Sequence, residues 1–442
     1  MEIIIVGAGA SALACGITAL KSGAKVTLLD KKDSPGRKIL ATGNGRCNLT
    51  NTFLESDCYN STDLELLEET IDKYKTKEIM DFFNKLGLML TDVSGYIYPN
   101  SKQSKTVVDV LFRTFQKYGG DFIPYCEVND IYLNEDNTFS VKTSITEYSI
   151  VKLKNREKLV PNNTYTKSFN CDKVVVATGS RAGTKDEENI GYTIARKFGH
   201  KINPTVPALV PLYCHSESNR EFFVDCKGVR ANGKIDLYSI YGDVRELICS
   251  DKGEIQFTEN GLSGIVTFQV SASANRLLLD KKCERVEIEL DLLDSLREEE
   301  ILKFLISDRQ LLEKTTFRQL ICGIINSSIA GTVCKEVIKE YGGFISEYNN
   351  YQSAIANIIH LLKHYIIVVD GSGDFENAQV CSGGILTEEI KNSFESKIVK
   401  NLYFIGEVLD VDGKCGGYNL HFAWASGIIS GENAGKSEDT DD

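Results

Sequence analysis

The first thirty residues constrain the fold more than any other part of the chain. Glu2–Val6 is a short run of mostly β-branched residues, Ala10–Lys21 has helical spacing, and Lys25–Leu29 again resembles a strand. A strand, a helix and a strand in this order form a βαβ unit, whose two strands are parallel and whose crossover is right-handed. The sequence therefore predicts an α/β fold built on a parallel sheet.

The turn between the first strand and the helix carries a dinucleotide-binding fingerprint. Residues 7–12 read Gly-Ala-Gly-Ala-Ser-Ala, which fits the pattern G-x-G-x-x-G/A. Gly7 permits the tight turn, Gly9 lets the backbone approach a pyrophosphate, and Ala12 lets the helix pack closely on the sheet. Asp30, at the end of the next strand, can accept hydrogen bonds from both ribose hydroxyls. These residues predict a site for an ADP-containing cofactor and leave FAD and NAD as alternatives.

Three later segments have features that suit a flavin. Residues 36–51 are too rich in Gly and Asn to form a regular element, and they could line a long cofactor or form a structural loop. Residues 177–179, Ala-Thr-Gly, follow a predicted buried strand, and residues 406–419 join a strand at Asn401–Ile405 to a final helix. The positive end of that helix suits the edge of a flavin that becomes anionic on reduction, and Glu407 could bind a ribityl hydroxyl.

The pattern along the rest of the chain predicts more than one domain, as its length of 442 residues also suggests. Three prolines between 204 and 211 precede short β-type runs that continue to about 291, and a mainly helical stretch follows. The other predicted elements are helical segments at 64–86 and 105–118, a β-meander at 121–176, a strand at 365–369 and a last helix at about 420–431.

Charge and apolar pattern limit the partners that we expect. The formal net charge of −12 and the isoelectric point near 5.2 would repel a phosphate backbone, and no dense Lys/Arg run offsets them. No apolar run is long enough to cross a bilayer, and Met1-Glu2-Ile3 lacks the basic start of a signal peptide. We therefore expect a cytoplasmic protein with a small-molecule substrate and with neither a nucleic acid nor a membrane as partner.

The cysteines and histidines give only weak candidates for catalysis. Thirteen cysteines without a CxxC pair argue against structural zinc, a CxxC redox centre and a disulfide framework. Cys47 could act as a thiol, and His421, in the first turn of the last helix, could act as an acid or base. His360 and His364 have the spacing of a metal pair, but no third ligand is near them in sequence, so we expect surface histidines and no metal.

Several long motifs together resemble one family of flavoproteins. They run from residue 4 to about residue 431 and read GAGASA, GRKILATGNGRCNLTN, YPNSKQSKTVVDVL, VVVATGS, GYTIARKFGH, PALVPL, FTENGLSG and GEVLDVDGKCGGYNLHFAWASG. The chain resembles the BaiN/YhiN-type family of FAD-dependent oxidoreductases, within the wider glutathione-reductase-like class. It departs from the family pattern at Ser180, where a further Gly is common, and at residues 152–168, which look like an extra hairpin.

The resemblance implies a discontinuous Rossmann-type FAD-binding domain interrupted by a β-barrel and a helical insert. The implied parts are 1–205 with 376–435 for the FAD domain, 206–294 with 364–375 for the β-barrel, 295–363 for the helical insert and 436–442 for a flexible tail.

The resemblance also assigns cofactor-binding positions. Gly7, Gly9 and Ser11 would face the pyrophosphate of FAD. The others are Asp30 at the adenosine ribose, Val128 at the adenine, Glu407 at the ribityl chain, Asn419 and Leu420 at the pyrimidine edge of the flavin, and, in the adjoining loops, Ala10, Lys31, Arg37, Lys38, Gly43, Asn44, Gly45, Arg46, Cys47, Ala177, Thr178, Gly179, Gly406, Asp412 and Gly417.

Three functions are compatible with such a site. The first is an FAD-dependent oxidoreductase that moves two electrons between NAD(P)H and a small organic acceptor, such as an enone. The alternatives are a flavin-dependent RNA-modifying enzyme and a non-catalytic FAD electron carrier. No second G-x-G-x-x-G unit follows a strand downstream, so we expect NAD(P)H, if it is the donor, to dock transiently.

Overall fold

The chain divides into two compact units, which we call unit 1 and unit 2. The computed structural model describes residues 1–153, 156–338 and 343–436. Unit 1 comprises Met1–Thr205 and Val380–Asp442, and unit 2 comprises Val206–Gln379. The tip of the predicted extra hairpin, 154–155, and the predicted flexible tail apart from Lys436 lie outside the described residues.

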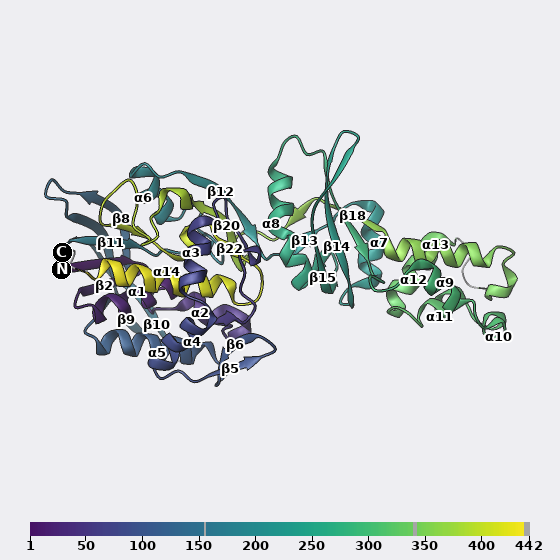
Figure 1. The fold of residues 1–442 in the computed structure, drawn as a ribbon, viewed down its shortest axis with the longest axis horizontal. Helices are drawn as coiled ribbons and strands as arrows, with labels where there is room; N and C mark the ends of the chain where they lie inside the picture. The colour runs from purple at the N-terminus through teal and green to yellow at the C-terminus, as the bar shows by residue number, and fades with distance from the viewer. Residues whose placement is uncertain (154–155, 339–342, 437–442) are drawn as a thin grey trace. The chain divides into compact units, whose positions relative to one another are not determined.

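A five-stranded parallel sheet forms the centre of unit 1 (Figure 1). Its strands, in spatial order, are β21 (Leu402–Phe404), β11 (Lys173–Val176), β1 (Glu2–Val6), β2 (Lys25–Leu29) and β7 (Asp121–Ile123). The chain adds strands on one side of β1 first and on its other side later, so the strand order reverses between β1 and β11. The predicted α/β fold with a parallel sheet is confirmed.

Two helices on this sheet, from opposite ends of the sequence, pack directly against each other. Helix α1 (Ala10–Lys21) connects β1 to β2, and α14 (Tyr418–Ala434) lies beside it (Figure 1). A Cβ atom on Gly427 would lie 2.4 Å from the carbonyl oxygen of Ser11, and one on Gly431 would lie 2.5 Å from that of Cys15. Glycine at both positions therefore allows the two helix backbones to touch.

The remaining elements of unit 1 surround this core. An antiparallel sheet of β8, β9 and β10, a small sheet of β3, β5 and β6, and the pairs β4 with β22 and β12 with β20 complete it. The bounds are α2 (Arg37–Ala41), α3 (Glu65–Lys73), α4 (Thr76–Lys85), α5 (Ser104–Lys117), α6 (Ile190–Lys197), β3 (Thr50–Asn51), β4 (Tyr59–Asn60), β5 (Leu90–Val93), β6 (Tyr96–Pro99), β8 (Cys126–Leu133), β9 (Phe139–Leu153), β10 (Arg156–Cys171), β12 (Ile202–Ala208), β20 (Val380–Ile385) and β22 (Asp412–Gly413), with short 3₁₀ helices at Thr42–Gly45, Ser56–Cys58, Thr387–Glu389 and Gly406–Val408.

Unit 2 combines a seven-stranded antiparallel sheet with helices around one hydrophobic core. The sheet order is β18-β17-β14-β15-β16-β13-β19, and only Asp370 separates its two edge strands along the chain. The bounds are β13 (Leu212–Tyr213), β14 (Arg230–Tyr241), β15 (Val244–Thr258), β16 (Gly261–Ser263), β17 (Arg285–Asp291), β18 (Tyr365–Val369), β19 (Gly371–Ser372), α7 (Glu217–Cys226), α8 (Ile265–Leu279), α9 (Glu298–Leu305), α10 (Arg309–Glu313), α11 (Phe317–Ile321), α12 (Ser327–Val337) and α13 (Tyr351–Lys363), with a 3₁₀ helix at Ile345–Glu347.

Most predicted elements are present, with shifted ends. The helical segment 64–86 is two helices, α3 and α4, because the chain leaves helical geometry at Tyr74 and Lys75. The last helix begins at Tyr418, two residues before the predicted start, since Gly417 adopts the left-handed conformation (φ 92°) that turns the chain into it. None of the helices in the described part of the chain has the length and apolar character needed to cross a membrane.

Candidate functional site

The predicted motifs follow the carboxyl ends of the parallel strands in unit 1. Gly7 follows β1, Asp30 follows β2 and Ala177 follows β11. Gly406 comes two residues after β21. Carboxyl ends of parallel strands meet at one edge of a sheet, and ligands of such sheets bind where the strand order reverses. The sheet therefore brings four separate segments to the edge where a dinucleotide would bind.

The first glycine turn meets the β11 turn at this edge. Gly7 has a φ of 102°, and a Cβ atom there would lie 2.4 Å from the carbonyl oxygen of Ala177, so only glycine fits. A Cβ atom on Gly9 would meet no described atom within 4 Å, which leaves open space in front of the backbone. No described side chain caps α1, whose first turn contains Ala10 and Ser11. Its N–H groups suit an anionic ligand.

Asp30 is built into the same turn. Its Oδ2 accepts a hydrogen bond from the N–H of Ala8 at 2.8 Å, and its Oδ1 accepts one from the N–H of Lys32 at 2.8 Å. Burial raises the pKa of Asp30, and these hydrogen bonds oppose that rise. Each carboxylate oxygen keeps a further lone pair, so Asp30 can also accept hydrogen bonds from ribose hydroxyls.

The loop after the second strand has an unusual backbone. Gly43 and Asn44 both have φ near 53°, Gly45 has 82° and Cys47 has 58°. This left-handed conformation is easy for Gly and tolerated by Asn, but it costs energy at Cys47, so the surrounding structure must hold the loop in place. Arg46, between them, is exposed.

Glu407 joins three of the predicted segments. Its Oε1 accepts a hydrogen bond from the N–H of Cys381 at 3.3 Å, and its Oε2 forms an ion pair with the Nζ of Lys38. A Cβ atom on Gly179 would lie 3.9 Å from that same Oε2. Thr178 and Gly179 are held in turn by Asn189, whose side chain bonds to the hydroxyl of the first and the carbonyl of the second. Loop 36–51, the β11 turn and the segment after β21 are thus in contact.

The start of α14 presents a second helix amino terminus. The side chain of Asn419 bonds to both the N–H and the C=O of Gly413, at 2.8 and 2.7 Å, and so closes the loop before the helix. This leaves the backbone of Asn419 and Leu420, but not the Asn419 side chain, for a ligand. A Cβ atom on Gly417 would lie 3.0 Å from the side chain of Asn48. The buried Oδ1 of Asn48 has no hydrogen-bond partner among the described residues. The sequence prediction placed Asn48 in a segment that could line the cofactor but did not name it as a site residue.

The other predicted cofactor residues are either buried or held in surface ion pairs. Val128 is buried on β8, directly before a register shift in its pairing with β9. Lys31 pairs with Asp186, and Arg37 Nη1 is 2.9 Å from Asp33 Oδ1, in each case at the surface of unit 1. Asp412 is buried on β22 and accepts a hydrogen bond from Asn60 at 3.0 Å.

The structure gives no support to Cys47 or His421 as catalytic groups. Both side chains are completely buried. Burial raises the pKa of the Cys47 thiol to about 12, so the reactive thiolate is scarce at neutral pH. Burial lowers the pKa of His421 to about 4, and its Nδ1 lies 2.7 Å from the hydroxyl of Thr50. The hydrogen bond and the burial fit a packed, neutral histidine.

The residues present fit a dinucleotide. Two uncapped helix amino termini, the open space at Gly9 and the acceptors of Asp30 suit phosphates and hydroxyls. The unpartnered Asn48 Oδ1 at the start of α14 offers a further acceptor for a ligand N–H.

Comparison with known proteins identifies the family. The family described as "HI0933-like protein Rossmann domain" matches residues 1–433. A 3-dehydro-bile acid delta(4,6)-reductase of Clostridium scindens is 31% identical over 437 residues, which are 98% of each chain. A ribosomal RNA dihydrouridine synthase of Escherichia coli is 27% identical over 439 residues, covering 96% of each chain. Among solved structures, a 3-ketosteroid delta1-dehydrogenase from Sterolibacterium denitrificans matches with 11% identity and a TM-score of 0.47, over 98% of this chain and 99% of the other.

The match covers nearly the whole chain and agrees with the resemblance seen in the motifs, which is confirmed. The protein belongs to the HI0933-like family of Rossmann-domain, FAD-binding proteins.

Proposed function

We propose that this protein is an FAD-dependent oxidoreductase that transfers two electrons between NAD(P)H and a small organic acceptor. One observation carries the proposal: two strand-to-helix junctions, β1–α1 and β21–α14, lie in contact in unit 1. A Cβ atom on Gly406 would lie 2.6 Å from the Oγ of Ser11. The segment expected to hold the pyrophosphate and the segment expected to hold the ribityl chain and flavin come from opposite ends of the polypeptide and are neighbours in the structure.

In this proposal each segment holds one part of FAD. Gly7, Gly9 and the first turn of α1 bind the pyrophosphate, and Asp30 binds the adenosine ribose. Glu407 binds the ribityl chain and would exchange its contact with Lys38 for one with a hydroxyl. The first turn of α14 directs its N–H groups toward the pyrimidine edge of the flavin, where positive potential favours the reduced, anionic form. FAD, when bound, supplies the two-electron chemistry.

The names of the relatives suggest the kind of acceptor. A bile acid delta(4,6)-reductase and a dihydrouridine synthase both saturate a carbon–carbon double bond. We therefore propose an acceptor whose C=C bond is conjugated to a carbonyl group, since the carbonyl lowers the cost of adding hydride to the distal carbon. The similarity to the reductase is the greater of the two, at 31% against 27% identity.

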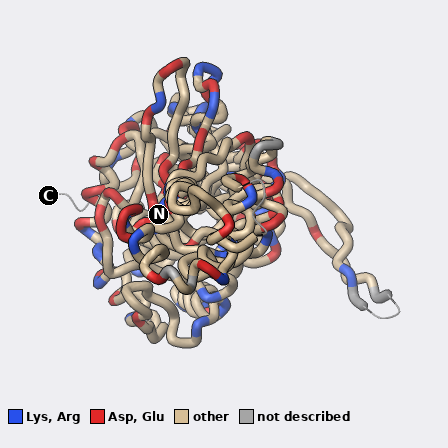
Figure 2. The backbone as a smooth tube through the Cα atoms, turned by 90° about the vertical axis from the view of Figure 1, so that its right-hand side faces the viewer, with Lys and Arg blue, Asp and Glu red and all other residues tan. Residues whose placement is uncertain are grey.

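An RNA substrate is the second candidate, because two relatives carry the dihydrouridine synthase name. Charge argues for the small molecule. The net charge is −12, and Figure 2 shows Lys and Arg interspersed with Asp and Glu along the backbone. An RNA-binding face needs clustered positive charge to neutralise phosphates.

The experiment is an anaerobic titration of the purified, FAD-loaded protein with NADH and with NADPH. The loss of flavin absorbance measures reduction. We expect one of them to reduce the flavin, and a cyclic enone to restore its colour in several turnovers. A colourless protein that takes up no added FAD contradicts the proposal. Reoxidation by unmodified ribosomal RNA but by no enone would favour the RNA-modifying alternative. Reducible flavin without turnover would favour the electron carrier.

We also propose a cytoplasmic location. None of the thirteen cysteines, all of which lie in the described part of the chain, forms a disulfide. Burial raises the pKa of many of the thiols, among them Cys15, Cys214 and Cys334. This number of cysteines without a disulfide suits a reducing compartment.

A further inference from the structure

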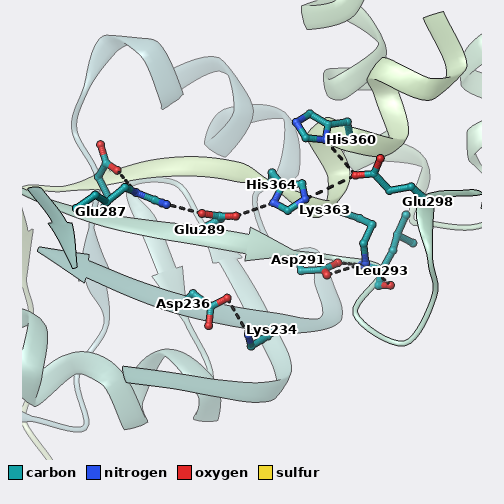
Figure 3. A network of polar contacts seen from close by, with 11 residues as sticks. Lys234, Asp236, Glu287, Glu289, Asp291, Leu293, Glu298, His360, Lys363 and His364 are labelled. Carbon is teal, nitrogen blue, oxygen red and sulfur yellow. Dashed lines mark hydrogen bonds and ion pairs between the residues drawn. The ribbon is translucent and has the colours of Figure 1, made fainter. Parts of the chain in front are cut away.

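Two histidines and a glutamate meet at one point on the surface of unit 2 (Figure 3). Glu298 is the first residue of α9, His360 lies in the last turn of α13, and His364 directly follows that helix. The sequence prediction found no third ligand for the histidine pair, because Glu298 lies 62 residues before His360. The structure supplies a third candidate ligand, because α9 lies beside α13.

The three side chains have the spacing of metal ligands. Oε1 of Glu298 lies 3.0 Å from Nδ1 of His360 and 3.6 Å from Nε2 of His364. One ligand atom from each residue lies within 4.8 Å of the other two. Ligands bound at about 2.0–2.2 Å to a tetrahedral zinc ion lie roughly 3.3–3.5 Å apart. Small rotations of these side chains would therefore admit an ion.

A second carboxylate orients His364 for this purpose. Nδ1 of His364 lies 2.6 Å from Oε1 of Glu289 on β17 (Figure 3). Nη2 of Arg245 donates to the other oxygen of Glu289 at 2.7 Å. A proton on Nδ1 leaves the lone pair of Nε2 facing Glu298. Metal-binding histidines are held in this way, by a carboxylate that accepts a hydrogen bond from the other ring nitrogen.

The neighbouring cations are turned toward other carboxylates. Nζ of Lys363 lies 2.7 Å from Asp291 (Figure 3). Arg245 bridges Glu287 and Glu289. The first turn of α9 is acidic, with glutamate at 298, 299 and 300. The local charge therefore favours a cation at the three ligands.

We propose that Glu298, His360 and His364 bind a divalent transition-metal ion of the zinc type and so clamp α9 to α13. Two imidazole nitrogens and one carboxylate oxygen suit Zn²⁺, whereas Mg²⁺ and Ca²⁺ prefer oxygen ligands. Three protein ligands leave a fourth position for water. The site lies wholly within unit 2 and does not depend on the proposed flavin chemistry.

Calorimetric titration of the FAD-loaded full chain with ZnCl₂ tests the site. The exposed thiol of Cys322 could also take up zinc, so every protein sample is first alkylated with N-ethylmaleimide. We expect one equivalent of Zn²⁺ to bind, and His360→Ala, His364→Ala and Glu298→Gln each to weaken binding at least about tenfold. Glu289→Gln should weaken it by about 10- to 100-fold, because it loosens His364. MgCl₂ should give no such binding.

His215 provides the matched control. It is an exposed histidine of unit 2 whose Nδ1 lies 2.8 Å from Asp370 Oδ1, and it is not part of the three-residue cluster. His215→Ala should bind Zn²⁺ like the unchanged chain, and Zn²⁺ should raise the melting temperature of both. The proposal is overturned if the unchanged chain binds no Zn²⁺, or if the His360 and His364 variants bind it as the His215 variant does.

Discussion

Asp30 shows how one residue can serve both a turn and a ligand. Its two oxygens accept the N–H groups of Ala8 and Lys32, each at 2.8 Å, so the carboxylate fixes the glycine turn before any cofactor is bound. The predicted role at the ribose uses lone pairs that these bonds leave over. A change at Asp30 therefore affects the pocket and the ligand together.

We predict that Asp30→Asn weakens FAD binding. An amide has one acceptor oxygen in place of two, so one backbone N–H loses its partner and the ribose loses a charged acceptor. A hydrogen bond to a charged group contributes about 1.5–3 kcal/mol, which corresponds to roughly 10- to 100-fold in the dissociation constant. FAD fluorescence during reconstitution of the apoprotein measures this.

Asp136→Asn is the control for that change, because Asp136 is an exposed carboxylate that also accepts a backbone N–H, from Thr138 at 3.1 Å, in the turn between β8 and β9. It should leave FAD binding unchanged. Equal affinity in the Asp30 variant and the unchanged chain would remove Asp30 from the site.

His421 should make the protein less stable in acid. Its pKa is about 4 in the folded chain and about 6.5 when unfolded. Between these values the unfolded chain takes up a proton that the folded chain does not, so the free energy of unfolding falls as pH drops from 6.5 toward 4, by up to about 3 kcal/mol. Above pH 6.5 this contribution is constant.

Urea unfolding at several pH values measures the effect. His421→Asn keeps a group that can bond to Thr50 but does not titrate, so it should flatten the fall in stability. His215→Asn, at an exposed position, should leave the dependence of stability on pH as it is in the unchanged chain. The same slope in all three chains would show that His421 does not cause it.

For single residues, the sequence identifies site residues whose partners are near in sequence and does not identify those whose partners are far away. Gly7 and Asp30 are recognisable because strand, turn and acidic residue lie within thirty positions. Asn48 and Glu298 were not named as candidate site residues. Their relevant neighbours in the structure, Gly417 and His360, lie 369 and 62 residues away in sequence. No local pattern marks a residue whose partner is so remote.

At the scale of elements, the contact between α1 and α14 holds the two junctions together. Gly431→Ala should lower the free energy of unfolding by about 1–3 kcal/mol, because the new Cβ would lie 2.5 Å from the carbonyl oxygen of Cys15 and backbone atoms cannot move aside. Chemical denaturation of the full chain measures this decrease in the free energy of unfolding. Flavin release or circular dichroism serves as the signal.

Gly331→Ala is the matched control. Gly331 also lies inside a helix, α12, but there a Cβ atom would meet only the side chain of Arg318, at 3.3 Å, which can shift. Alanine should then be neutral or stabilise by up to about 1 kcal/mol through helix propensity. Stabilisation by both changes would mean that the α1–α14 contact is not tight.

Sequence patterns identify the elements better than their ends or their neighbours. The apolar run at β11 and the amphipathic periodicity of α5 are local, and both were predicted within one or two residues. The order of the parallel strands was not predicted, because it depends on which side of β1 the distant strands β11 and β21 join. That choice is made by tertiary packing rather than by local preference.

At the scale of the whole molecule, each unit has a core of its own. The two hydrophobic clusters share no residue, and one lies in unit 1 and the other in unit 2. The chain leaves unit 1 through β12 and returns through β20, which pair with each other. Replacing residues 209–379 with a short Gly-rich loop should therefore leave unit 1 folded and able to retain FAD.

Circular dichroism and FAD occupancy after gel filtration measure that outcome. The control is the full chain carried through the same purification. A shortened chain that is unfolded, or that unfolds without cooperativity, would show that unit 1 requires unit 2 for its stability.

The pairing of α1 with α14 has a consequence during protein synthesis. The ribosome releases α1, β1 and β2 first, but β21 and α14 emerge only after all of unit 2 has been made. Since domains tend to fold as units as they emerge, unit 2 can complete its core while unit 1 still lacks an edge strand and the helix that covers α1. The amino-terminal part of unit 1 therefore exposes apolar surface on the ribosome until β21 and α14 have been synthesised.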